Sequence, residues 1–191
     1  VITLDYAKSS LDMIENIGEK TGQPVQLVQA DAFRLPFKDD KIDIVFHQGL
    51  LEHFTNPQGI VSENFRVIKP GGFTCADVPQ RYHFYTVVKH VLIWMNKWFA
   101  GWETEFSKPQ LENMFTSCGF TIHKVYGDWM RPSFIYRAFR EAFKKVGIKL
   151  PLYPKGVPGL SGIRRVIREN FRKTNLSYFT FMDIGVIGTK K

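Results

Sequence analysis

Residues Ile42–Phe54 read IDIVFHQGLLEHF, and this stretch decides the predicted fold. The apolar, β-branched run Ile42–Phe46 predicts a buried strand. His47 and Gln48 follow it, and Gly49 then turns the chain toward a helix whose first N–H groups are unpaired. Polar groups directly after a buried strand are typical of the ligand-binding edge of an open α/β sheet.

Strand and helix signals alternate on both sides of this stretch. Further strands are expected at 1–4, 25–28 and 73–78, and helices at 9–22 and at about 57–67. Ser9 is the expected N-cap of the first helix, and Gly22 its end. The segment Arg66–Gly72, RVIKPGG, predicts a turn before the strand at 73–78. Strands separated by helices of this length predict βαβ units and a parallel sheet.

The second half of the chain has a different composition. Residues 79–105 are rich in aromatic side chains, and residues 129–175 hold 12 basic but only 2 acidic residues. We expect helices at 107–119, 134–146 and 161–173, and strands at 121–126 and 179–187. In 84–99 the apolar side chains, including Val91 and Met95, share one helical face, and Lys89 lies away from it. The apolar residues of the two basic helices are expected to form buried faces; they are Phe134, Phe139, Phe143, Ile163, Val166, Ile167 and Phe171.

Composition and charge exclude several classes of protein. The 191 residues are 44% hydrophobic, which is enough for the core of one globular domain and excludes a disordered chain. Cys75 and Cys118 stand far apart, so a disulfide framework or a zinc ribbon is excluded. The longest apolar stretch, 84–100, carries Lys89 and Lys97 and is too short to span a bilayer. We expect a cytoplasmic protein with a formal charge of +8, whose basic segment could meet an anionic partner.

Two carboxylates follow predicted strands. Asp5 ends the first strand, where a carboxylate can accept both hydroxyls of a ribose. Asp31 follows the second strand in the segment QADAF, where it could accept from an adenine amino group, next to Ala32. An aspartate in a turn is also an ordinary turn former, so neither residue is decisive alone.

Taken in order, these segments resemble class I S-adenosylmethionine-dependent methyltransferases, and most of all the small-molecule branch that includes the ubiquinone-biosynthesis type. The resemblance covers residues 1 to about 126 and the final strand, and DIVFHQGLLEHF with RVIKPGG is its most specific part. It implies an α/β fold, a three-layer Rossmann-like doubly wound sheet of order 3-2-1-4-5-7-6. That sheet is mostly parallel, with an antiparallel final strand.

The resemblance also assigns roles to individual residues. Asp5 would hold the ribose of S-adenosylmethionine and Tyr6 would flank it, while Asp31 and Ala32 would contact the adenine. His47 and Gln48 would lie under the methionine part of the cofactor; those six residues are the predicted cofactor site. No metal site is predicted.

One departure from the family is the glycine-rich loop between its first strand and first helix, which this sequence lacks. We therefore expect a single methyltransferase domain, 1–191, that is a fragment truncated before the family's second strand. Strands two and four would then have unpaired inner edges. The isolated chain is expected to bind S-adenosylmethionine poorly.

An acceptor pocket is expected beyond the fifth strand of the family. Residues 79–105 would form an aromatic lid, in which Tyr82, Tyr85 and Trp102 offer an apolar wall for a small or lipid-like acceptor, and Glu103 a polar contact. The alternative is that these aromatic residues only pack an extra helix on the sheet. His83 is the candidate general base, since an unperturbed imidazole titrates near neutrality.

Other readings remain open at this stage. The chain could be a non-catalytic remnant whose basic, amphipathic insertion at 129–175 binds a membrane surface or a protein partner. A nicotinamide-dependent dehydrogenase would also use an acid at the position of Asp5, but the Asp31-Ala32 and Val67–Gly72 segments argue against it. No nucleic-acid-binding module is recognised, so nucleic acid is not an expected partner. Peripheral membrane contact and a dimer are both left open.

Overall fold

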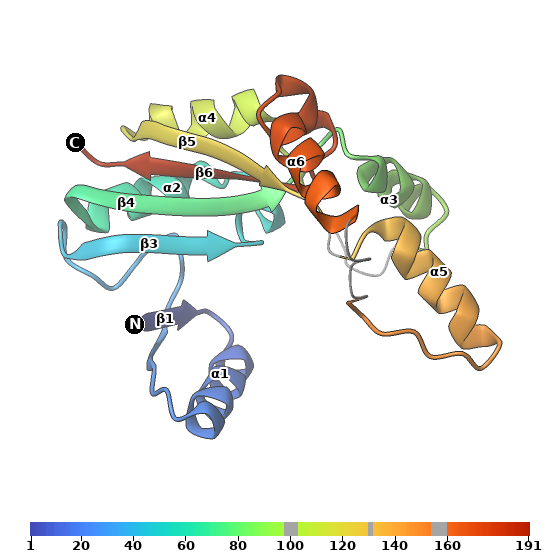
Figure 1. Ribbon diagram of the computed structural model, residues 1–191. Coiled ribbons are helices and arrows are strands. Elements are labelled where there is room, and N and C mark those ends of the chain that lie inside the picture. Colours follow the sequence, from blue (N-terminus) through green and yellow to red (C-terminus); the bar gives the residue numbers. More distant parts are fainter. Residues whose placement is uncertain (98–102, 130–131, 154–159) are drawn as a thin grey trace.

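The computed structural model describes residues 1–97, 103–129, 132–153 and 160–191 (Figure 1). Its strands are β1 (Ile2–Asp5), β2 (Gln26–Gln29), β3 (Ile42–Gln48), β4 (Ile68–Pro79), β5 (Thr121–Asp128) and β6 (Asp183–Thr189). Its helices are α1 (Lys8–Thr21), η1 (Leu51–His53), α2 (Gln58–Val67), α3 (Phe84–Trp94), α4 (Lys108–Ser117), α5 (Phe134–Lys145), α6 (Leu160–Arg172) and η2 (Asn175–Phe179).

The strand order is that of the family resemblance with one strand missing. β1 and β2 form a parallel pair, and β3, β4, β6 and β5 form a second sheet in that order. β3 and β4 are parallel, while β6 is antiparallel to both of its neighbours. In the described part of the chain, no strand pairs with β1 on the side of β3 or with β3 on the side of β1. The predicted α/β class with an antiparallel last strand is confirmed.

One face of the larger sheet is covered by α2 and α4 (Figure 1). Ile60 and Val61 of α2 and Leu111 and Phe115 of α4 are buried there, each exposed by 1% or less. They pack in one core cluster with alternate side chains of β4 and β6, including Val186. Burial of this apolar area is the main stabilising term of the fold.

The other face of β3 is open, which corrects the prediction of a fully buried strand. Ile44 and Phe46 are 63% and 61% exposed, whereas Val45 between them packs against the core. Successive side chains of a strand point to opposite faces, and only the α2 side of β3 is covered in the described structure. An unbroken apolar run predicts a strand with two apolar faces, and it does not say whether both are covered.

The helix ends agree in part with prediction. Gly22 ends α1 in the left-handed conformation, and Ser107 begins α4 in a capping box with Gln110. Ser9, however, lies inside α1, and Ala7 is at the N-cap position. The Ala7 N–H donates to the carboxylate of Asp5 at 2.8 Å, in a turn that leads into α1, and no side chain caps the helix.

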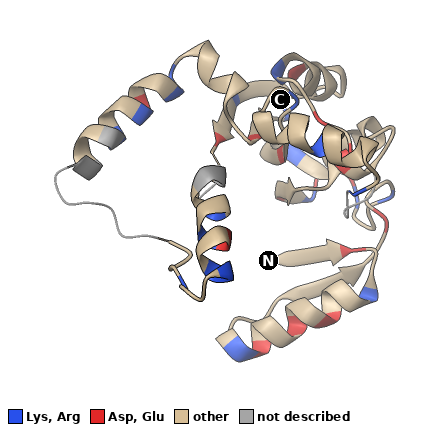
Figure 2. Ribbon diagram, turned by 90° about the vertical axis from the view of Figure 1, so that its right-hand side faces the viewer, with Lys and Arg blue, Asp and Glu red and all other residues tan. Residues whose placement is uncertain are grey.

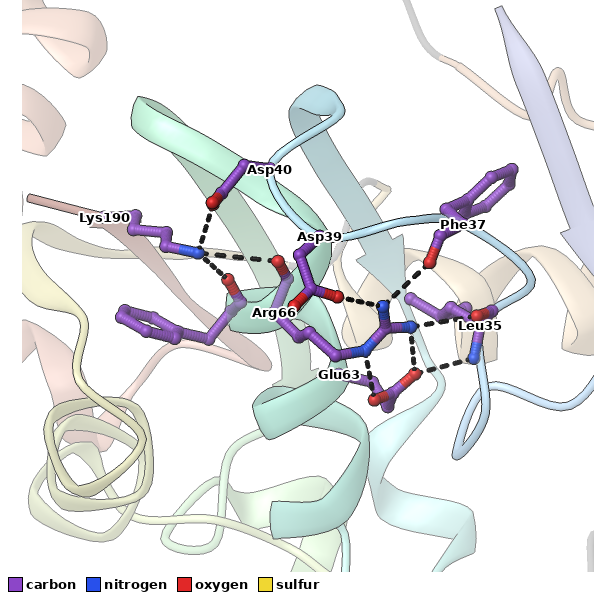
Figure 3. A network of polar contacts seen from close by, with 8 residues as sticks. Leu35, Phe37, Asp39, Asp40, Glu63, Arg66 and Lys190 are labelled. Atoms are coloured by element: carbon purple, nitrogen blue, oxygen red, sulfur yellow. Dashed lines mark hydrogen bonds and ion pairs between the residues drawn. The ribbon is translucent and has the colours of Figure 1, made fainter.

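Arg66 ties the loop after β2 to α2 (Figure 3). Its guanidinium donates to the carbonyls of Leu35 and Phe37 and forms ion pairs with Glu63 at 2.8 Å and Asp39 at 2.7 Å. The same guanidinium lowers the pKa of the Glu63 carboxyl, because hydrogen bonds from a cation stabilise its charged form. This network connects the β1–β2 part of the chain to the larger sheet.

In the RVIKPGG segment, Arg66 and Val67 end α2, and the remaining residues form a bulge at the start of β4 and not a separate turn. Ile42 pairs with Ile68 but Ile44 pairs with Phe73, so extra residues loop out between them. Gly71 has a φ of 81°, and a side chain at Gly72 would collide with the carbonyl oxygen of Asp43. Both glycines are therefore required by the backbone path.

The helices of the second half correct a further prediction. The residues expected to form buried apolar faces on α6, Ile163, Val166 and Ile167, are 61%, 61% and 64% exposed. On α3, Val91 and Met95 are 49% and 45% exposed. Lys89, expected to point to solvent, is 2% exposed. None of the described helices is both long enough and apolar enough to cross a bilayer.

Candidate functional site

The carboxylates of the predicted nucleoside site lie at one edge of the sheet. Asp5 and Asp31 follow the neighbouring parallel strands β1 and β2, whose register pairs Asp5 with Gln29. The Ala30 N–H donates to the Asp5 carbonyl at 3.1 Å and closes the connection between them. Carboxyl ends of parallel strands are where open α/β sheets bind ligands.

Each of these carboxylates also shapes its own loop. Oδ1 of Asp5 accepts from the Ala7 N–H at 2.8 Å, and Oδ1 of Asp31 accepts from the Phe33 N–H at 2.9 Å. Both are turns in which an aspartate bonds the backbone two residues on. The loop role and a ligand role are compatible, since each bond uses one oxygen of its carboxylate. Tyr6, between β1 and α1, is 77% exposed.

The loop after β2 touches the segment after β3. Ala32 is half-buried and packs against the core, while the ring of Phe33 meets that of Phe54 edge-on, with 5.0 Å between their centroids. Gly59 at the start of α2 leaves room for Phe33, because a Cβ there would come within 2.8 Å of its ring. The structure thus brings Asp31 and Ala32 into the neighbourhood of the LLEHF segment.

His47 and Gln48 point to opposite faces of β3. The His47 ring is on the α2 side, where Nε2 lies 3.0 Å from Nδ2 of Asn64, and burial lowers its pKa to about 4. Gln48 is exposed on the open face, opposite Asp77 of β4. Of the two predicted cofactor contacts at this strand end, Gln48 presents its side chain to the open face and His47 does not.

Glu52 is a buried acid that the sequence reasoning did not single out. It lies in η1 with 5% of its surface exposed, and its Oε2 has no hydrogen-bond partner among the described residues. Burial raises the pKa of its carboxyl, and the negative charges of Glu103 and Asp183 add to the effect. The sequence does contain an indication of this buried acid, since in the segment LLEHF an acid interrupts an apolar run.

More carboxylates collect at the carboxyl end of β4. Asp183 begins β6 opposite Asp128 of β5, and Asp77 of β4 lies two residues further along the same face. Burial raises the pKa of Asp183 to about 6, with contributions from the charges of Asp77 and Asp128. At neutral pH this end of the sheet is acidic, whereas the helices beyond it are basic.

The predicted acceptor residues begin where β4 ends. Tyr82 is 54% exposed and packs against Phe179 with 5.5 Å between ring centroids; Tyr85 is half-buried. His83 is the N-cap of α3, and its Nδ1 accepts from the Tyr85 N–H at 3.1 Å. A neutral His83 in this arrangement carries its proton on Nε2, so that nitrogen is a donor. Trp102 lies outside the described residues.

Glu103 is held by a buried lysine. Nζ of Lys89 lies 3.0 Å from Oε2 of Glu103 and also pairs with Glu105. The side chains of Lys89 and Glu105 are 3% and 9% exposed. An acceptor that bound to Glu103 would therefore have to share its carboxylate with Lys89. A shallow hollow between α2 and α4, lined by residues such as Asn56, contains none of the predicted site residues.

Comparison with known proteins agrees with the fold. Residues 1–76 match the family model described as methyltransferase domain. An uncharacterized methyltransferase of Mycobacterium tuberculosis is 42% identical over 52 residues, 27% of this chain and 20% of that protein. A demethylmenaquinone methyltransferase of Anoxybacillus flavithermus is 28% identical over 144 residues, 65% of this chain and 61% of that protein. The chain therefore spans less than two thirds of the length of these relatives.

A solved structure shows the same architecture. A SAM-dependent methyltransferase from Thermotoga maritima superposes with a TM-score of 0.62 at 18% identity, over 100% of this chain and 72% of that protein. Residues 1–76 are therefore similar to a methyltransferase domain, and the chain shares its fold with the protein from Thermotoga maritima.

Proposed function

We propose that this protein takes part in S-adenosylmethionine-dependent methyl transfer to a small or lipid-like acceptor. The observation that carries the proposal is that Asp5 and Asp31 lie at the carboxyl ends of adjacent parallel strands, in the strand order of the methyltransferase fold. The proposal includes the chemistry of the acceptor, a cytoplasmic location and peripheral contact with a membrane.

The residues present fit the nucleoside half of the cofactor. Asp5 would accept from the ribose hydroxyls with Tyr6 beside the sugar, and Asp31 with Ala32 would contact the adenine. Gln48, exposed on the open face of β3, would reach toward the methionine part, and His47 would contribute through its backbone because its ring contacts Asn64. When bound, the cofactor supplies an electrophilic methyl group. The protein's task is then to align the acceptor and exclude water.

The side chains at the end of β4 favour a flat, apolar acceptor. Tyr82 and Tyr85 offer aromatic surface there, and Glu103 offers a carboxylate already oriented by Lys89. One relative is named for demethylmenaquinone, a quinone-type acceptor. We extend that class of acceptor to this protein as a proposal; Trp102 remains a predicted contact.

Binding of the cofactor tests the proposal directly. Titration of the 191-residue chain with S-adenosylmethionine in a calorimeter should show weak binding, since no strand fills the space between β1 and β3 in the described residues. A fusion that places a strand and a glycine-rich loop ahead of Val1 should bind at least tenfold more tightly. Asp5→Asn in that fusion should lose most of the gain, whereas Asp12→Asn on α1 should not. Micromolar binding by the unmodified chain would contradict the expected weakness.

His83 is proposed as the general base. Because Nε2 carries the proton in the cap arrangement, this role requires Nδ1 to release the Tyr85 N–H and take the proton of the acceptor. Its capping role therefore demands a matched pair of variants. Asparagine is a good N-cap residue but cannot accept a proton, whereas alanine can do neither. In the fusion protein, a base role predicts that His83→Asn and His83→Ala both slow methyl transfer at least tenfold. If His83→Asn turns over at the original rate, the residue is only the cap of α3.

The second candidate is a binding protein without catalysis. It is favoured by the exposed apolar faces of α3 and α6 described above. The two candidates separate in the fusion protein when tritiated S-adenosylmethionine is offered with hydroquinones or with a cell extract. Transfer of label supports the methyltransferase, and its absence despite tight cofactor binding supports the binding protein.

A further inference from the structure

Helix α6 carries an apolar stripe that faces solvent. Ile163, Val166 and Ile167 are spaced three and four residues apart and share one face of the helix. They are 61%, 61% and 64% exposed. We call these three residues the outward stripe.

The opposite side of α6 is anchored to β5 through cations. The guanidinium of Arg168 lies 4.5 Å from the ring centroid of Trp129, and that of Arg172 lies 5.6 Å from it. Arg172 also donates to the Gly127 carbonyl at 3.1 Å and to the Asp128 carboxylate at 3.0 Å. These contacts fix the rotation of the helix, so the outward stripe is held away from the protein and does not face out by chance.

The two helices of the basic segment carry exposed cations. Arg165 is exposed on α6, and Arg137, Lys144 and Lys145 are exposed on α5. Figure 2 shows basic residues along both helices, with few acidic ones between them. Over 129–175 the 12 basic residues exceed the acidic ones by 10.

A second helix at the same end of the molecule also exposes apolar side chains. α3 lies beyond the carboxyl end of the sheet, as α5 and α6 do (Figure 1). It buries Lys89 and exposes Val87 by 57%, Phe84 by 66% and Trp94 by 85%. Tryptophan is favoured where an apolar phase meets water, since its ring is apolar and its N–H is polar.

We propose that the outward stripe of α6 docks on an anionic lipid bilayer. An amphipathic helix with a basic polar side lies in the plane of the interface, with its apolar stripe in the acyl region and its cations at the headgroups. A bilayer with anionic lipid offers both phases along the whole length of the helix. The charge excess selects an anionic surface over a neutral one.

This docking deepens the proposed function, because it would bring the acceptor end of the protein to the phase in which a lipid-like acceptor dissolves. The relevance to methyl transfer rests on that proposal. Docking itself needs neither cofactor nor acceptor, so its test is independent of catalysis.

The test is co-flotation of the full chain with vesicles. One set contains phosphatidylcholine alone, and the other contains phosphatidylcholine and phosphatidylglycerol in equal amounts. We expect the chain to float with the anionic vesicles only, and added salt to weaken the binding. The variant I163S/V166S/I167S should bind at least tenfold more weakly.

A matched control lies on α1, where Met13 and Ile17 are 65% and 54% exposed on a helix that carries three acids, Asp12, Glu15 and Glu19, against two lysines. M13S/I17S should bind as the original chain does. Circular dichroism and the melting temperature should be the same for all three proteins, since only exposed side chains change.

Three outcomes would overturn the proposal. The original chain could fail to float with anionic vesicles, or the α6 and α1 variants could lose binding equally. In the third outcome, light scattering shows a dimer or protein complex that the α6 variant does not form, and neither the original chain nor the variant binds vesicles. In that case the outward stripe is a protein interface.

Discussion

Helices α2 and α4 bury their apolar sides, whereas α3 and α6 expose theirs. Ile60 and Leu111 are exposed by 1% or less in the first pair, while Val166 of α6 is 61% exposed. The first pair packs on the sheet, and the second pair lies beyond its end (Figure 1). All four are amphipathic in sequence, so amphipathicity identifies two faces of a helix but does not say which one meets the protein.

The largest expected effect tests the buried side of this comparison. Phe115→Ala in α4 should lower the free energy of unfolding by about 4 kcal/mol, because it removes a fully buried ring and leaves a cavity. Val166→Ala in α6 should change it by less than about 0.5 kcal/mol, because the side chain is mostly in water. Urea denaturation measures both. Equal losses would mean that the α6 face is covered in solution.

The next effect tests the buried cation of α3. Lys89→Met should cost about 3 kcal/mol, since it leaves the carboxylates of Glu103 and Glu105 buried without their partner. Adding Glu105→Gln to that variant should recover part of the loss, because one unpaired charge is removed. Denaturant unfolding of the single and double variants gives the comparison. A loss below about 0.5 kcal/mol for Lys89→Met would show that the lysine reaches solvent.

The smallest effect concerns the contact between α2 and β3. Burial lowers the pKa of His47 from 6.5 to about 4, so the folded state resists protonation that the unfolded state accepts. Stability is therefore complete above pH 6.5 and is lost as the pH falls toward 4, by about 2 kcal/mol at pH 5. His47→Gln should flatten this part of the curve. The raised pKa of Asp183 acts in the opposite sense, since its contribution to stability falls as the pH rises through about 6. The control variant Asp183→Asn removes this contribution.

The candidate site was predictable where a short segment determines its own geometry. Asp5 and Asp31 stand directly after strands, and parallel strands bring their carboxyl ends together, so their shared edge followed from the sequence. The direction of the His47 ring did not follow, because Asn64 reaches it from α2. The raised pKa of the buried Glu52 carboxyl depends in the same way on distant groups, such as Glu103 and Asp183.

By itself the sequence determined the order and type of the elements and the ends of α1 and α4 at Gly22 and Ser107. These depend on hydrophobic period and on local backbone chemistry, which a segment carries with it. Only the tertiary structure decided that Ser9 is not a cap, that one face of β3 is open, and that α6 turns Ile163 outward. The last of these rests on Trp129 and Asp128 holding Arg172, and contacts between residues so far apart in the chain have no local signature.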